Sequence, residues 1–136
     1  TRSGICEEGV RLKSVLLIMR RASVAQGLMA KVRDAPGIQL CYEPDYATAD
    51  VAIRAHLAAG ALLEVSEDGA HDIDFCLALC ARRREVSPHC RRMQMCPEGQ
   101  TEAVRRVIEA KRKGESDDFV FYDVSRDYLA ASLQSL

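Results

Sequence analysis

The chain has 136 residues, the length of one compact domain, and it can bury a substantial core. Nineteen basic residues nearly balance twenty acidic residues, and a net charge of −1 argues against binding nucleic acid or an acidic membrane through overall charge. No apolar run approaches the roughly 18 residues of a membrane span, and the first residues lack the apolar segment of a secretory signal. We therefore expect a cytoplasmic protein.

Five short apolar runs are predicted strands, and each is followed by a segment whose apolar residues have helical spacing. The strands are expected at residues 14–19, 38–42, 61–65, 92–96 and 119–123. The helices are expected at residues 23–34, 47–58, 72–85, 101–113 and 125–136. Strict strand–helix alternation implies a parallel sheet with helices on both faces. Residues 1–12 are interpreted as an N-terminal extension and residues 13–136 as one domain.

The spacing of apolar residues predicts which side chains each helix buries. These are Val24, Leu28, Met29 and Val32 in the first helix, Val51, Ile53 and Leu57 in the second, Ile73, Cys76, Leu77 and Cys80 in the third, and Tyr128, Leu129 and Leu133 in the last. Asp72, Thr101 and Ser125 are candidate N-terminal caps, and Gly114 is a candidate stop after the fourth helix.

The cysteine spacing does not match a zinc site, which usually has CxxC pairs on turns with histidines at matching spacing. Several of the cysteines lie in apolar surroundings, where a free thiol behaves as a small hydrophobe. The six are Cys6, Cys41, Cys76, Cys80, Cys90 and Cys96. We expect buried reduced thiols and no metal, with metal or redox roles as the alternative.

In an open parallel sheet the ligand site lies outside the carboxyl ends of the strands. The residues expected there are Met19 and Arg20, Tyr42 and Glu43, Glu64, Cys96, and Tyr122 and Asp123. Glu64 stands out, because it places a carboxylate at the end of an apolar strand, and a partly buried carboxylate needs a partner. Any site chemistry is therefore expected from this set.

Three segments resemble the receiver domain of bacterial response regulators (CheY-like), in its NarL/FixJ-like form. They are KSVLLIMRRASVAQGLMAKV (13–32), GALLEVSEDG (60–69) and DDFVFYDVSRDYLAASL (117–133). The resemblance covers the chain from about Lys13 to Leu136. It implies a three-layer α/β/α fold with a five-stranded parallel sheet in the doubly wound order 2-1-3-4-5. It also implies two-component signal transduction, with a DNA-binding output domain that would lie outside this chain.

The resemblance places every residue of the family's phosphorylation pocket on a different residue type. The two acidic residues that hold magnesium fall on Met19 and Arg20, and the phosphoacceptor aspartate falls on Glu64. The threonine or serine after the fourth strand falls on Cys96, and the lysine of the fifth strand falls on Tyr122. Magnesium prefers carboxylate oxygens, so we expect its binding to be lost and no cofactor to be needed.

The sequence leaves three interpretations of Glu64 open. The side chain could imitate a phosphorylated acceptor, although glutamate carries less charge and fewer oxygens than a phosphoryl group. It could form an ion pair with Arg20 that fills the former metal site, which is the favoured hypothesis because Arg suits bidentate contact with carboxylate. It could also be solvated at the rim of the sheet.

In the resembling family, signals pass to the surface formed by the fourth helix, the fifth strand and the last helix. The residues that could form this signalling or dimer surface here are Arg105, Arg106, Lys111, Arg112, Phe121, Asp123 and Asp127. Because basic residues of the helix precede the acidic residues, opposite charges could pair across a two-fold axis. A homodimer or a partner protein is expected at this surface, with a solvated charged face as the alternative.

We favour a non-catalytic, atypical receiver that dimerises or binds a partner without aspartate phosphorylation. One alternative is a phosphoacceptor receiver that uses Glu64 or a nearby carboxylate such as Asp68. Another is a small flavodoxin-like enzyme or ligand-binding domain with Cys96 or His71 in a pocket. A catalytic Cys96 would need a base, and His89, seven residues upstream, precedes its strand.

Overall fold

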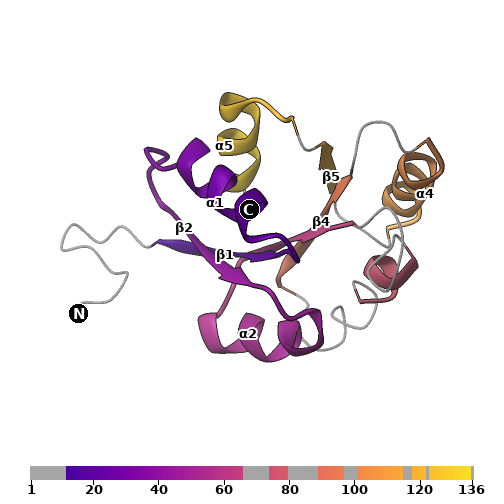
Figure 1. Ribbon diagram of the computed structural model, residues 1–136, viewed down its shortest axis with the longest axis horizontal. Coiled ribbons are helices and arrows are strands. Elements are labelled where there is room, and N and C mark those ends of the chain that lie inside the picture. The colour runs from indigo at the N-terminus through magenta and orange to yellow at the C-terminus, as the bar shows by residue number, and fades with distance from the viewer. Residues whose placement is uncertain are drawn as a thin grey trace.

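The computed structural model describes residues 12–65, 74–79, 89–96, 101–114, 118–121 and 123–135 (Figure 1). Its strands are β1 (Lys13–Ile18), β2 (Ile38–Glu43), β3 (Gly60–Glu64), β4 (Arg91–Cys96) and β5 (Asp118–Phe121). Its helices are α1 (Ala22–Lys31), the short 3₁₀ helix η1 (Tyr46–Thr48), α2 (Ala49–His56), α4 (Thr101–Arg112) and α5 (Arg126–Gln134). Residues 74–79 are also helical. All five predicted strands and all five predicted helical segments are thus represented.

The strands form one sheet in the order β2-β1-β3-β4-β5, and every neighbouring pair is parallel. This confirms the predicted fold class and strand order. Consecutive strands that are parallel require crossover connections, and the helices provide them. The carboxyl ends of β1, β3 and β4 therefore meet at one edge of the sheet, where the sequence predicts the site.

Two hydrophobic cores fill the space between the sheet and its helices. On one face, Val15, Leu17 and Leu62 pack with residues of α1 and α5. On the other face, Leu16, Ile18 and Leu63 pack with residues of α2, the helix at 74–79 and α4. Figure 1 shows α1 and α5 above the sheet and α2 below it. Alternate residues of β1 thus serve opposite cores, which explains the unbroken apolar runs of the strands.

The predicted helix ends are partly confirmed. The Ser125 hydroxyl accepts a hydrogen bond from the Tyr128 N–H at 3.2 Å, so Ser125 caps α5. Gly114 follows α4 with φ of 79°, which glycine adopts without strain. Thr101 is already helical, so it is not the residue that precedes α4. Asp72 lies outside the described residues.

The predicted buried faces are right for α1 and wrong in part for α2 and α5. Val51 and Leu57 are exposed by 63% and 86%, and Tyr128 by 53%. In α2 the sheet is faced by Ala49 and Ile53, which are four residues apart, so Val51 points away from it. Leu57 ends the helix at φ 50° and turns its side chain outward.

Ile73 and Cys80 lie outside the described residues, whereas Cys76 is buried as predicted.

Among the described helices none is long and apolar enough to cross a membrane.

Leu57 should limit stability, because an L-residue with a side chain is strained in the left-handed region and this side chain buries little surface. We expect Leu57→Gly to raise the free energy of unfolding by about 0.5–1 kcal/mol. Urea denaturation followed by circular dichroism measures the change. Leu57→Ala keeps the strained Cβ and is the matched control, so equal stability of the two variants would contradict this explanation.

Candidate functional site at the carboxyl edge of the sheet

Glu64 is the last residue of β3, and its carboxylate is buried. The side chain is only 3% exposed, although the residue lies at the edge of the sheet. An ionised carboxylate loses several kcal/mol of hydration at such a position unless donors replace the water. The structure around Glu64 is therefore organised by the need to supply those donors.

The segment between β1 and α1 supplies them. The backbone N–H groups of Arg20 and Arg21 donate to Oε1 of Glu64 at 2.9 Å and 3.3 Å. The guanidinium of Arg21 donates to Oε2 through Nε and Nη2, both at 2.6 Å. Each carboxylate oxygen thus accepts two contacts, and the guanidinium contacts are charge-assisted. The donors tie the end of β3 to the connection that follows β1.

This arrangement also stabilises the start of α1. Arg21 is the residue that precedes the helix, its backbone is extended, and its own side chain makes no capping hydrogen bond. The first turn of α1 contains no acidic residue. The Glu64 carboxylate, which belongs to β3, supplies the negative charge that is favourable beside the N-terminus of a helix.

The ion pair predicted for Glu64 exists, but the predicted partner was wrong. Arg20 uses only its backbone N–H, while its side chain is exposed, and the neighbouring Arg21 provides the guanidinium. Arg21, and not Arg20, directly precedes α1. The backbone N–H groups of both residues point to Oε1, and the side chain of Arg21 is the one that reaches Oε2. The interpretation of Glu64 as a solvated rim residue is wrong, because its side chain is buried.

The main-chain oxygen of Glu64 is held as well. The Tyr46 hydroxyl, in η1 after β2, donates to it at 2.6 Å, and the Cys76 thiol lies 3.7 Å from it. Tyr46 is buried, and its ring lies 6.1 Å from that of Phe75 between centroids. Sequence analysis missed Tyr46. The sequence feature that could have indicated it is a tyrosine within the polar segment EPDYAT. In the structure Asp45 accepts a hydrogen bond from the Ala47 N–H and so shapes the turn that holds Tyr46.

The other predicted pocket positions contribute no polar ligand in the described structure. Met19 is fully buried and packs in the core under α1 and α5. Cys96 ends β4 at the same edge as Glu64, but it is buried in the opposite core, which contains residues of α2 and α4. Tyr122 and Asp68 lie outside the described residues. Within the described ranges no group of three or more His, Cys, Asp or Glu side chains could hold a metal ion.

Cys96 is unsuited to nucleophilic chemistry. Burial raises the pKa of its thiol to about 12, so the reactive thiolate is scarce near neutral pH. His89 precedes β4 and is exposed, so it lies at the opposite end of that strand from Cys96. His71 lies outside the described residues. The pKa direction and the geometry both argue against an activated Cys96.

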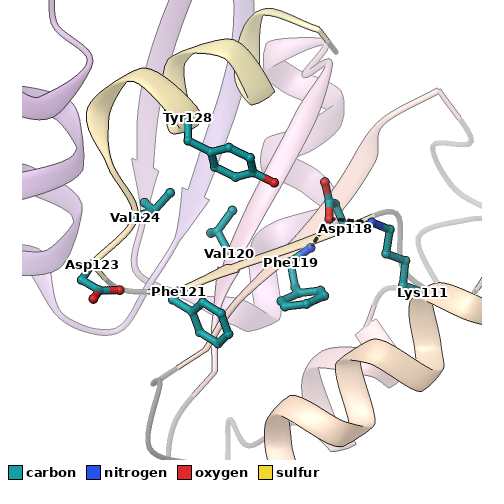
Figure 2. A pocket seen from close by; sticks show the side chains of 8 residues that line it. All are labelled: Lys111, Asp118, Phe119, Val120, Phe121, Asp123, Val124 and Tyr128. Carbon is teal, nitrogen blue, oxygen red and sulfur yellow. Dashed lines mark hydrogen bonds and ion pairs between the residues drawn. The ribbon is translucent and has the colours of Figure 1, made fainter.

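The predicted signalling surface contains a hollow. Its volume is about 360 Å³, and we call it the α4–β5–α5 groove. It is lined by Lys111, Asp118, Phe119, Val120, Phe121, Asp123, Val124 and Tyr128. Figure 2 shows Tyr128 reaching from α5 over Val120 on one side of β5, while Phe119 and Phe121 point to the other side. The groove is thus apolar inside, with charged residues at its rim.

Most of the charged residues predicted for this surface form ion pairs within the chain. Arg105 contacts Glu102 and Glu109, Arg106 contacts Asp74, and Lys111 contacts Asp118. Asp127 contacts the adjacent Arg126. The hydrogen bond and charge of Arg105 lower the pKa of Glu102. Arg112 and Asp123 have no ion pair with any described residue. Fewer charged side chains are therefore available to pair across a two-fold axis than the sequence predicted.

Comparison with known proteins gives matches in structure only. No protein-family model matches the sequence, and no curated protein shows significant sequence similarity. A response regulator from Thermotoga maritima superposes with a TM-score of 0.72 at 14% identity, covering 91% of this chain and 96% of that chain. The signal receiver domain of the putative response regulator NarL from Mycobacterium tuberculosis gives 0.68 at 17%, covering 91% and 94%.

A third match is a DNA-binding response regulator of the LuxR family from Staphylococcus aureus. It gives a TM-score of 0.70 at 12% identity and covers 91% of this chain and 98% of that chain. At these identities the likeness establishes the fold. The chain therefore has the fold of response regulator receiver domains, and Glu64 ends the third strand of that fold.

The side chain of Arg21 should matter more for stability than that of Arg20. Arg21→Ala removes both guanidinium contacts from a buried carboxylate, and we expect it to lower the free energy of unfolding by about 1–2 kcal/mol, since Arg21 is itself half exposed. Arg20→Ala keeps the backbone donor and should change the free energy by less than about 0.5 kcal/mol. Urea denaturation of both variants distinguishes them. A larger loss with Arg20→Ala would contradict the observed pairing.

Proposed function

We propose that this chain is an atypical receiver domain that acts in signal transduction in the cytoplasm without aspartate phosphorylation. The observation that carries the proposal is the contact set of Glu64. Its carboxylate, at the end of the third strand, already accepts hydrogen bonds from two backbone N–H groups and a guanidinium. We infer that the Arg21 guanidinium takes the place of the metal ion that phosphoryl transfer would require beside this carboxylate.

Charge neutralisation is the main requirement for transferring a phosphoryl group to a carboxylate. Magnesium would need hard oxygen ligands beside Glu64. The two positions directly after β1, where the resembling family has acidic residues, hold Met19 and Arg20. Met19 is buried in the core, and the guanidinium of Arg21 would repel a divalent ion. The donor set of this edge therefore does not fit magnesium, and the proposal includes no cofactor and no enzymatic activity.

The α4–β5–α5 groove is the proposed docking surface. It combines partly exposed apolar side chains with Asp123, which has no ion pair with any described residue. Apolar patches rimmed by charges are typical of protein interaction sites. We propose that a partner protein, or a second copy of the chain, binds there. The LuxR-family neighbour is described as DNA-binding, and by analogy this chain would be the receiver part of a transcription regulator.

A phosphoacceptor receiver is the competing function, and mass spectrometry separates the two. We expect the intact protein, incubated with a small phosphodonor and millimolar magnesium, to gain no phosphoryl group, because the Glu64 oxygens are engaged by Arg20 and Arg21. A gain in mass that Glu64→Gln abolishes would establish Glu64 as an acceptor. A gain that persists in Glu64→Gln but is lost in Asp68→Asn would assign Asp68. Either result would contradict the proposal.

A further inference from the structure

The two edge strands of the sheet differ in how well they are protected. β5 is short, begins with the charged Asp118, and has the Lys111–Asp118 ion pair beside it. β2, at the other edge, is six residues long and contains no proline, lysine or arginine. Natural proteins commonly protect an edge strand with such residues, or by keeping it short, so that it does not pair with another chain.

The backbone of β2 has hydrogen-bonding groups that point away from the sheet. The N–H groups of Lys13 and Met19 donate to the oxygens of Gly37 and Glu43, so the odd-numbered residues of β2 bond to β1. In a parallel ladder the alternate residues face the other way, and these are Ile38, Leu40 and Tyr42. No described strand lies beyond β2 to bond with them.

The side chains of these residues are apolar and only partly buried. Ile38, Leu40 and Tyr42 pack against the core under α1 and α5. Beside them is a hollow of about 230 Å³. It is lined by Met29, Val32, Arg33, Ile38 and Leu40. The outward backbone groups therefore lie next to an unfilled depression lined by four apolar side chains and Arg33.

We propose that the β2 edge pairs with β2 of a second copy of this chain, antiparallel and about a two-fold axis. Leu40 lies opposite Leu40 of the second copy, and Ile38 lies opposite its Tyr42. Each such hydrogen-bonded pair exchanges two backbone bonds, and its side chains share one face of the sheet. The sheets of the two molecules become continuous.

Two features favour a second copy over an unrelated strand. In this register Tyr42 of the second copy stands beside Ile38, on the face where the depression lies, and its ring can contact the Arg33 guanidinium there. The edge is also self-complementary, because the same three residues direct their backbone groups outward in both copies and antiparallel pairing satisfies all of them. A two-fold axis satisfies both relations twice with the same residues.

Sedimentation velocity over a range of concentrations, on the full chain, tests the proposal. The wild-type protein should form dimers. Gln39 is exposed on β2, so Gln39→Lys adds the protecting charge without entering the core, and we expect it to weaken the dimer by about tenfold or more. Gln26→Lys makes the same charge change on the exposed side of α1 and should leave the association unchanged.

Cross-linking tests the register. Gln39 lies opposite Cys41 of the second copy in a non-hydrogen-bonded pair, whose Cα atoms are about 4.5 Å apart and within reach of a disulfide. Under mild oxidation Gln39→Cys should therefore give a covalent dimer. The double variant Gln39→Cys, Cys41→Ser should not.

The proposal is overturned by a wild-type chain that stays monomeric, or by a covalent dimer that persists without Cys41. It is also overturned by a dimer that Tyr128→Ala weakens and Gln39→Lys does not, because such a dimer would use the α4–β5–α5 groove. None of these outcomes bears on the pocket at Glu64, so the absence of phosphorylation can hold or fail independently.

Discussion

The buried carboxylate of Glu64 is the constraint around which the carboxyl edge of the sheet is arranged. A charge that is removed from water must be compensated nearby, and here the compensation comes from the connection between β1 and α1. Because Arg21 lies directly before α1, the same interaction fixes the start of that helix. On the other side of Glu64, the Tyr46 hydroxyl holds its main-chain oxygen and links η1 to the end of β3. One residue thus connects three strand ends.

In the proposed function, a receiver fold keeps its shape without phosphorylation chemistry. In this chain the contacts of Glu64 hold the strand ends and the first helix together. An arginine and a glutamate can supply such contacts permanently, with no metal and no transferred group. The α4–β5–α5 groove and the β2 edge, at opposite sides of the sheet, are the two surfaces proposed for association. In the proposed function, regulation would depend on which partner occupies those surfaces.

Much of the fold could be predicted from the sequence, because buried parallel strands give unbroken apolar runs and helices give regular spacing. The sheet order came from the resemblance to receivers, and the structure confirms it. The exposure of Val51 and Tyr128 could not be predicted, since an apolar residue at the border of a helical face can point either way. The choice between Arg20 and Arg21 depended on where α1 begins, and a shift of one residue there exchanges their roles. Tyr46 was missed because its partner is a main-chain oxygen, so the sequence showed only a tyrosine in a polar segment and not what it binds.

The most direct test of the central claim is an amide NMR titration of the wild-type protein with magnesium and beryllofluoride, which imitates a bound phosphoryl group. The Arg20 and Arg21 amides, which donate to Glu64, report directly on the pocket. If the Glu64–Arg21 pair closes the pocket, these amides and that of Cys96 will not shift at millimolar magnesium. Saturable shifts at Arg20 and Arg21 that extend to α4 and β5 would contradict the account and show a working phosphorylation switch.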